Sequence, residues 1–155
     1  MRARMPVPPS VKSQWCSDKN RPSFFDMKKG LFCAGIAGLT GVILGALGTH
    51  ALKEILTVNG TLSVWETAVL YHLVHSVAVL VMNLFTSMQP FAESKWTSRA
   101  STAWLIGIGL FSGSLYLLAL GGPKWLGPIT PLGGIFLLAG WIYVVIGSFK
   151  LQIKK

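Results

Sequence analysis

The stretch TLSVWETAVLYHLVHSVAVLVMNLF, residues 61–85, decides the fold of this chain. It is apolar enough and long enough to cross a bilayer as a helix. Its first half nevertheless carries Glu66, Tyr71, His72 and His75. Ionisable side chains at membrane depth are costly, so they need a partner or a function. We therefore expect the other apolar segments to pack around this one and its polar side chains.

The composition indicates an integral membrane protein. The 155 residues are 52% hydrophobic and only 12% charged, with 17 glycines, which is more apolar than soluble domains are. A formal net charge of +9 would favour nucleic-acid binding in a soluble protein. Here the basic residues cluster at the ends of apolar runs, as in membrane proteins, so no nucleic-acid partner is predicted. Cys16 and Cys33 form no C-x-x-C pair, and we expect no disulfide.

Four apolar segments predict an all-α integral membrane bundle of four transmembrane helices within residues 27–155. The predicted spans are about 30–52, 61–85, 102–120 and 131–149. Residues 1–26 are basic, aperiodic and contain several prolines, which predicts a disordered tail. Met27, which two lysines follow, is an alternative start of the chain, and a transit peptide is a third interpretation of the tail.

The lysines and arginines predict the orientation of these spans. Twelve of the 14 lie in the N-terminal tail, the second loop and the C-terminus, whereas Lys53 and Lys124 lie on the other side. Without residues 1–26 the contrast is seven to two. Because loops on the cytoplasmic side carry an excess of lysine and arginine, we expect both termini in the cytoplasm.

Glycines recur along two of the predicted spans. Small residues at this spacing let another helix approach closely in lipid, so we expect them to line helix–helix contacts. The predicted packing glycines are Gly38, Gly41, Gly45, Gly48, Gly109 and Gly113. Besides the lipid bilayer, a second copy of the chain or another membrane protein would be a suitable partner for such a surface.

The histidines are candidates for a buried polar site. His72 and His75 are three apart and share a helix face. If the first two spans form a hairpin that turns at 59–61, His50 lies level with Tyr71 and His72. Three histidines at one level would be weak candidates for zinc or copper ligands or for a proton path, and His50 with His72 or His75 could hold haem. The simpler interpretation is that each ring donates to a backbone carbonyl or to Tyr71. The sequence therefore implies no particular cofactor.

Glu66 has a structural interpretation as well. SVWE, residues 63–66, fits a capping box in which Ser63 caps the second span and Glu66 reaches back to its amide. No H-E-x-x-H pattern or carboxylate pair indicates hydrolysis. An enzyme would need a polar cleft at the end of the bundle opposite the termini, lined by His50, Lys53, Glu54 and Glu66. We expect the protein not to be an enzyme.

Several ordered blocks resemble a known family. They are GALGTHAL (45–52), WETAVLY (65–71) with His75-Ser76, FSGSLY (111–116), ITPLGG (129–134) and GW (140–141). With their matching spacing they resemble the small inner-membrane proteins grouped as the domain of unknown function 423 family, whose animal relatives are called transmembrane protein 256. The resemblance covers roughly residues 30–148. It implies a four-span membrane protein with no established activity, and it supplies no catalytic residues.

The resemblance also bears on the polar residues. His50, Glu66, Tyr71 and His75 lie where the family pattern has polar positions, whereas His72 departs from it, since glutamine is commoner there. We therefore expect a buried polar cluster of His50, Glu66, Tyr71 and His75 that holds the first helical hairpin together. The resemblance implies a bacterial inner (plasma) membrane, or the mitochondrial inner membrane if the source is eukaryotic.

We therefore predict a small multi-pass inner-membrane protein without enzymatic activity, in which this cluster is structural. The alternative is a small transporter, a channel, or a metal- or haem-binding membrane subunit that uses the same residues. The two interpretations differ in structure. A structural cluster is dry and fully hydrogen-bonded, whereas a transport or ligand site opens to a cavity.

Overall fold

Every regular element that the structure describes is a helix. The computed structural model describes residues 24–85 and 95–151. Its elements are α2 (Phe24–Thr49), α3 (Lys53–Val58), α4 (Leu62–Phe85), α5 (Lys95–Gly107), the π-helix η2 (Ile108–Ser112), α6 (Gly113–Ala119), the 3-10 helix η3 (Lys124–Leu126) and α7 (Ile129–Leu151). Four stretches are long and apolar enough to span a membrane, namely Lys28–Thr49, Leu62–Phe85, Lys95–Ala119 and Lys124–Phe149. The predicted all-α architecture with four apolar spans is confirmed.

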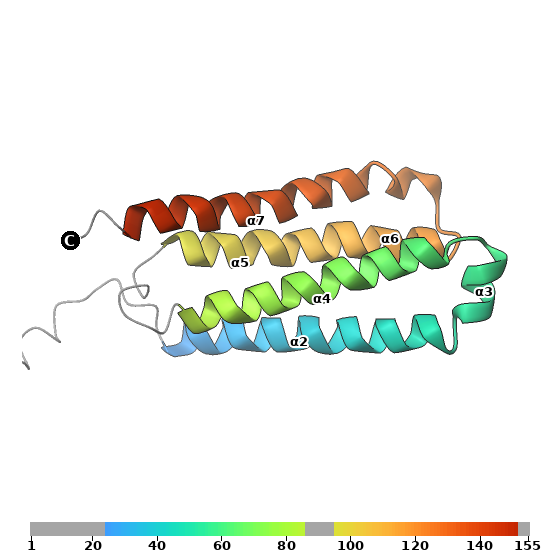
Figure 1. Cartoon of the computed structure of the whole chain (residues 1–155), viewed down its shortest axis with the longest axis horizontal. Coiled ribbons are helices and arrows are strands. Elements are labelled where there is room, and N and C mark those ends of the chain that lie inside the picture. Colours follow the sequence, from blue (N-terminus) through green and yellow to red (C-terminus); the bar gives the residue numbers. More distant parts are fainter. Residues whose placement is uncertain (1–23, 86–94, 152–155) are drawn as a thin grey trace, which may run out of the picture.

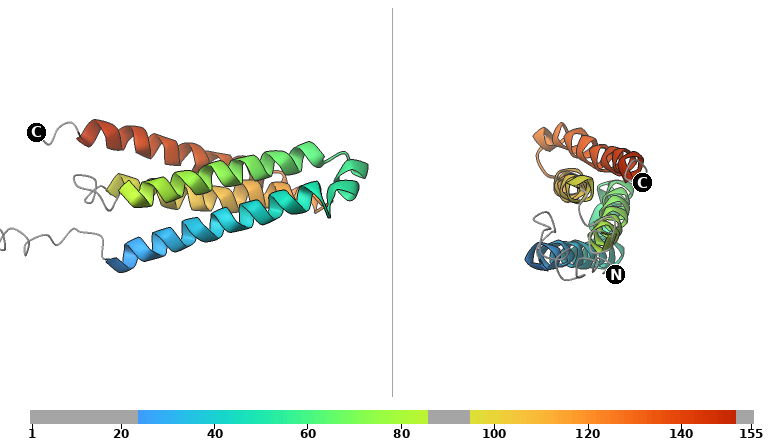
Figure 2. Two further views of the ribbon diagram at one scale, coloured as in Figure 1. Left: turned by 60° about the horizontal axis from the view of Figure 1, so that its bottom comes forward. Right: turned by 90° about the vertical axis from the view of Figure 1, so that its left-hand side faces the viewer.

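The four long rods lie side by side, with α4 and α5–α6 at the centre (Figure 1 and Figure 2). α2 packs on α4, α4 packs on α5 and α6, and α7 packs on α5 and η2. The outer rods are the least covered, since 17% of the apolar window is buried in each of them, against 44% in the span Lys95–Ala119. The start of α2 and the end of α7 lie at the same end of the bundle (Figure 1).

The first helix differs from its prediction at both ends. α2 begins at Phe24, so residues 24–26 are helical rather than part of a disordered tail. The rest of the predicted tail, residues 1–23, lies outside the described residues. α2 ends at Thr49 instead of at residue 52, because the chain leaves the axis of the rod there and turns into the short helix α3.

A compact corner joins the first two spans. α3 crosses the end of the bundle between α2 and α4 (Figure 1). Its Leu56 is fully buried beside Trp65 and Ala68 of α4, which fixes the corner by apolar contact. Gly60 then reverses the chain at a φ of 66°, a left-handed conformation that glycine adopts without strain. The hydroxyl of Thr61 donates to the carbonyl oxygen of Ala119 at 2.7 Å, so the corner is also tied to α6.

The third rod begins earlier than predicted. α5 starts at Lys95 instead of at residue 102. Its first turns are amphipathic: Thr97, Ala100 and Ser101 are buried, whereas the residues between them are exposed. A search for a continuous apolar run misses such turns, because only one face of the helix is covered by protein.

A π-helix interrupts this rod. In η2 the backbone closes i→i+5 hydrogen bonds, which accommodates one additional residue in the turn. Gly133 of α7 lies directly against it, and a Cβ atom on Gly133 would collide with the main chain of Phe111. Before the π-turn α5 packs on α4 and α7, whereas α6 beyond it packs mainly on α4.

Two apolar clusters form the core at successive levels of the bundle. One contains Leu56, Trp65, Ala68, Tyr116 and Ala119, and the other contains Ala34, Val79, Ala100, Trp104 and Leu137. Along α4, the polar residues His72, His75 and Ser76 lie between Ala68 of the first cluster and Val79 of the second. The polar side chains of α4 therefore form a layer between two apolar layers.

Candidate functional site

The candidate site is the polar layer on the buried face of α4. The buried residues of this helix recur at intervals of three and four, which is the period of one helix face. They are Trp65, Ala68, His72, His75, Ser76 and Val79. His72 is only 6% exposed and His75 only 5% exposed. Both histidines therefore have to find hydrogen-bond partners inside the protein.

His75 uses both of its ring nitrogens. Nδ1 lies 2.8 Å from the carbonyl oxygen of Tyr71, one turn earlier in α4. Nε2 lies 3.2 Å from Nε1 of Trp141 in α7. An indole N–H can only donate and a carbonyl oxygen can only accept. His75 is therefore a neutral imidazole that carries its proton on Nδ1, and it joins α4 to α7.

Aromatic rings surround His75 on three sides. The Tyr71 ring stacks on the imidazole with a centroid distance of 5.9 Å and an interplanar angle of 17°. The rings of Trp104 and Trp141 each lie 6.2 Å away at steep angles. These two indoles also contact each other at 4.9 Å. The surroundings of the imidazole are thus apolar apart from its two hydrogen bonds, which favours the neutral ring.

His72 joins α4 to two other helices. Its Nδ1 lies 3.3 Å from the hydroxyl of Tyr116 in α6, and its Nε2 lies 3.4 Å from the hydroxyl of Thr40 in α2. The Thr40 hydroxyl donates to the carbonyl of Ile36 or Ala37, at 2.9 and 3.0 Å, so its oxygen is left to accept. His72 therefore donates from Nε2 to Thr40 and accepts at Nδ1 from Tyr116.

Serines complete the polar layer. The hydroxyl of Ser76 donates to the carbonyl oxygen of His72 at 2.7 Å. Ser114 lies 2.7 Å from the hydroxyl of Thr130, which joins α6 to α7. Ser112, in the π-helix, is 1% exposed, and its hydroxyl makes no hydrogen bond within the described residues. It is a buried polar group within the distorted π-turn.

The predicted cluster of His50, Glu66, Tyr71 and His75 does not form, because only His75 of these four is buried. Tyr71 is 41% exposed, although its ring does contact His75. Glu66 follows the buried Trp65 directly, so it lies about 100° away from the buried face of α4 and is exposed.

The prediction that His50 lies level with Tyr71 and His72 was wrong, because the register of α2 against α4 differs from the expected one. Gly41 of α2 lies against Leu73 of α4, and Gly48 lies against Trp65. This register brings His50 level with the first residues of α4, about two helical turns short of His72. The corner helix α3 takes up the intervening residues, and His50 lies exposed in the turn before it. A His50–His75 haem pair is therefore not formed.

The metal and capping hypotheses have no counterpart in the described geometry. Among residues 24–85 and 95–151, no three His, Cys, Asp or Glu side chains converge to hold an ion. Ser63 is not an N-cap, since α4 already begins at Leu62 and the carbonyl of Thr61 accepts the first helical hydrogen bond, from Trp65. Lys53 and Glu66, two of the residues named for an enzymatic cleft, are both exposed.

Half of the predicted packing glycines line a helix contact. Gly41, Gly45 and Gly48 lie against α4, where their nearest side chains are Leu73, Val69 and Trp65. A Cβ atom on Gly38, Gly109 or Gly113 would meet no other atom within 4 Å. Sequence reasoning missed glycines in the contact that α7 makes with α5 and η2, among them Gly107, Gly133 and Gly140.

Sequence reasoning also missed the partners of the two histidines. Thr40, Tyr116 and Trp141 make the contacts that the predicted cluster assigned to other residues. Tyr116 and Trp141 stand within the blocks FSGSLY and GW. Both can form hydrogen bonds from inside an apolar span, and this was the signal that could have found them.

Comparison with known proteins identifies relatives over most of the chain. The UPF0382 membrane protein of Haemophilus influenzae is 38% identical over 122 residues, which cover 79% of this chain and 94% of that protein. The UPF0382 membrane protein YwdK of Bacillus subtilis is 36% identical over 126 residues, covering 80% and 98%. The UPF0382 inner membrane protein YgdD of Escherichia coli is 37% identical over 125 residues, covering 80% and 92%.

The family profile described as "Protein of unknown function (DUF423)" matches residues 44–134. No solved structure matches the chain. The predicted resemblance is confirmed, and so is the prediction of a membrane protein. With this match and with relatives that align over nearly their whole length, the chain belongs to the DUF423 family and is, like those relatives, a membrane protein.

Proposed function

We propose that the protein has no enzymatic activity and that His72 and His75 are structural, fastening α4 to the other three spans. The observation that carries this proposal is the use of both ring nitrogens in each imidazole. His75 bonds to Tyr71 and Trp141, and His72 bonds to Thr40 and Tyr116. A ligand or a transferred proton needs a free nitrogen lone pair, and each ring has already used its own.

The energetics agree with a fastening role. Hydrogen bonds between helices in lipid contribute about 0.6 kcal/mol each on average. Two such bonds at His72 and one at His75 give α4 a small preference for one arrangement of its neighbours. Losing the partners would cost more than these bonds contribute, because an unpaired histidine would leave a buried polar group in an apolar layer. The partners therefore specify which helices can pack on α4.

Histidine ¹⁵N NMR of the whole protein in bilayers tests this proposal. We expect a proton on Nδ1 in His75 and on Nε2 in His72, with both rings neutral. Trp141→Phe should alter the signals of His75 and leave those of His72, and Tyr116→Phe should do the reverse. The exposed His50 provides an internal reference outside the packed layer. Signals of a charged ring, or of rings that do not respond to these variants, would refute the fastening role.

A second candidate is a ligand or transport site at His75. One observation favours it: a groove of about 210 Å³ on the side of α4 is lined by Leu70, Tyr71, Val74 and His75. A small ligand that entered there would displace Trp141 from Nε2. Elemental analysis and absorption spectra of purified protein distinguish the two roles. A metal or haem that is present in the wild type and lost in His75→Phe would favour the ligand site.

We further propose that the protein lies in the plasma membrane of a bacterium with both termini in the cytoplasm. The name of the Escherichia coli relative, an inner membrane protein, supports the first part. The charge distribution supports the second, because Lys28 and Lys29 stand near the start of α2, and Lys95 and Arg99 near the start of α5. Both helix starts lie at the end of the bundle where α7 ends (Figure 1). A reporter that is active only in the cytoplasm should therefore be active when it is fused after Lys155. An inactive reporter would contradict the proposed orientation.

A further inference from the structure

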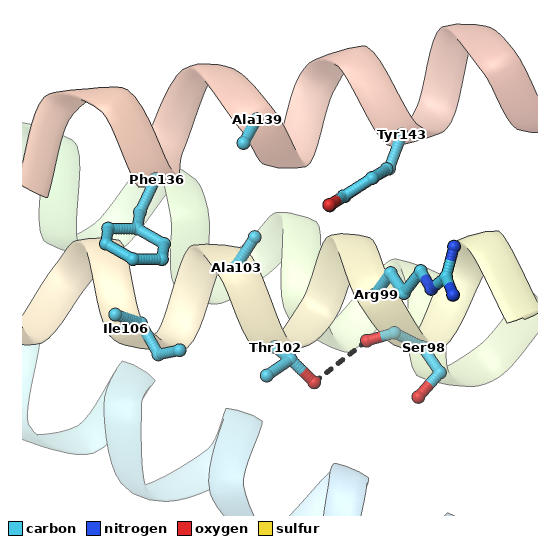
Figure 3. A pocket seen from close by; sticks show the side chains of 8 residues that line it. All are labelled: Ser98, Arg99, Thr102, Ala103, Ile106, Phe136, Ala139 and Tyr143. Carbon is cyan, nitrogen blue, oxygen red and sulfur yellow. Dashed lines mark hydrogen bonds between the residues drawn. The ribbon is translucent and has the colours of Figure 1, made fainter.

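A lateral groove of about 570 Å³ runs between α5 and α7 (Figure 3), and neither His72 nor His75 lines it. At one end its walls carry polar groups from Ser98, Arg99, Thr102 and Tyr143. Thr102 donates to the carbonyl oxygen of Ser98 at 3.0 Å. Figure 3 shows Arg99 and Tyr143 at this end on facing helices, with the Tyr143 hydroxyl directed toward α5.

The other end of the groove is apolar. It is lined by Ala103, Ile106, Phe136 and Ala139. The two alanines face each other with short side chains between the helices (Figure 3), while Ile106 and Phe136 are 41% and 38% exposed. Seven residues separate Arg99 from Ile106, so the groove changes from polar to apolar over about 10 Å along the helix axis.

The polar end carries positive charge without a described counter-ion. The guanidinium of Arg99 lies over the ring of Trp96 at 5.2 Å, and the ammonium of Lys95 lies over the same ring at 5.7 Å. Among the side chains that the structure describes, the carboxylates are Glu54 in α3 and Glu66 near the start of α4. Both of these segments lie at the opposite end of the bundle (Figure 1). An anion at Arg99 would therefore meet no described negative charge.

Aromatic side chains indicate the depth of the polar end. The rings of Trp96 and Tyr143 contact each other at 5.9 Å, and tryptophan and tyrosine concentrate where the membrane meets water. Lys95 begins the helix at this level. The polar end of the groove thus lies at head-group level, and its apolar end reaches into the hydrocarbon.

We propose that this groove binds one anionic phospholipid. The head-group phosphate lies on Arg99, where a guanidinium can form paired hydrogen bonds with phosphate oxygens, and an acyl chain runs along Ile106 and Phe136. Basic pockets between transmembrane helices are suited to such head groups. Free phosphate shares the chemistry of the head group but lacks the chain, so the apolar end of the groove distinguishes the two. The inference is independent of the role proposed for the histidines.

Native mass spectrometry of the full chain tests the charged end. The probes are phosphatidylglycerol and phosphatidylcholine with the same acyl chains. We expect the wild type to retain phosphatidylglycerol preferentially, and Arg99→Gln to lower this retention about fivefold, the effect of one basic residue near the head groups. Lys53→Gln removes the same charge at the opposite end of the bundle and should leave retention unchanged. Equal retention of both lipids, or equal loss in both variants, would overturn the proposal.

A second pair of variants tests the apolar end while Arg99 stays in place. Ala139→Leu fills the floor of the groove and should lower phosphatidylglycerol retention, whereas Ala46→Leu, on an exposed face of α2, should not. If Arg99→Gln does not fold, the comparison of Ala139→Leu with Ala46→Leu still tests whether the groove binds the lipid. If inorganic phosphate displaces the bound lipid and Ala139→Leu has no effect, the groove is an ion site and the lipid proposal is wrong.

Discussion

The contact between α2 and α4 and the contact between α5 and α7 are built on the same device. In each, a tryptophan of the inner helix lies over a glycine of the outer helix, and its indole N–H donates to a main-chain carbonyl one turn earlier. The sets are Trp65 with Gly48 and Leu44 (3.0 Å), and Trp104 with Gly140 and Leu137 (3.2 Å). The absent Cβ atom exposes the carbonyl, so glycine serves here as a hydrogen-bonding position as well as a close-packing one.

The two contacts differ in which atoms meet. In the contact with α4, the glycines belong to α2. The atoms that lie against them are side-chain atoms, such as Leu73 against Gly41 and Val69 against Gly45. Where α7 packs on η2, at the end of α5, Gly133 meets the main chain of Phe111 instead. Side chains can move aside by rotation, whereas a main chain fixed in a helix cannot. The first contact should therefore tolerate added atoms better than the second.

The largest expected effect is at Gly133. Its added methyl group would meet the backbone of Phe111, so Gly133→Ala should lower the free energy of unfolding by about 3 kcal/mol, the upper range for overpacking. The neighbouring Gly134 is a matched control, because its Cβ atom would lie 3.8 Å from the Phe111 ring, an ordinary contact. Unfolding in mixed micelles measures both. Equal loss in the two variants would contradict the backbone argument.

Gly48→Ala and Gly140→Ala test the shared device. Each methyl group would displace a tryptophan indole, and we expect losses of about 1–3 kcal/mol in the free energy of unfolding. Gly45→Ala is the comparison, since Val69 needs to yield only slightly at 3.2 Å. If Gly45→Ala costs as much as Gly48→Ala, the hydrogen-bonded indole is not what makes these positions special.

Trp104→Phe and Trp65→Phe remove the indole hydrogen bond while keeping an aromatic ring. Each should lower the free energy of unfolding by about 0.6 kcal/mol from the lost bond, with a further loss from the smaller ring. Double-mutant cycles with Gly140→Ala and Gly48→Ala isolate the pairwise contribution. A coupling energy of zero in either cycle would show that the glycine and the indole act independently.

The smallest effects are expected at Gly38, Gly109 and Gly113. No atom lies within 4 Å of a Cβ atom at these positions, so alanine should change the free energy of unfolding of the single chain by no more than about 0.5 kcal/mol. Sedimentation in detergent gives a second readout. A variant that keeps its stability but loses self-association would assign these glycines to a contact between copies, as the sequence pattern allowed.

The four spans could be predicted because a bilayer requires a long apolar helix, and residues 61–85 and their neighbours supply it. The corner could not. KEILTV, residues 53–58, is compatible with one continued helix and with a helix folded across the bundle end. That choice moves His50 by two turns relative to α4, so the predicted pairing of His50 with His75 failed with it.

The partners of the histidines escaped prediction for a related reason. Spacing along α4 shows that His72 and His75 share a face, but it does not show which helix covers that face. The predicted cluster joined His75 to α2 through His50, whereas His75 bonds to α7, and His72 bonds to α6 as well as to α2. His72 was left out of the predicted cluster because glutamine is commoner at its position in the family, although its hydrogen bonds reach two other helices.

The π-turn between α5 and α6 determines which face of α6 is turned to the bundle. Twelve residues separate Trp104 from Tyr116, and in an unbroken α-helix their side chains would point about 120° apart. The π-turn takes up one of these residues, so both side chains stay near the same face, where Trp104 bonds to α7 and Tyr116 bonds to His72 of α4. Deleting one residue from 108–112 should therefore restore a regular α-helix and leave Tyr116 beside His72.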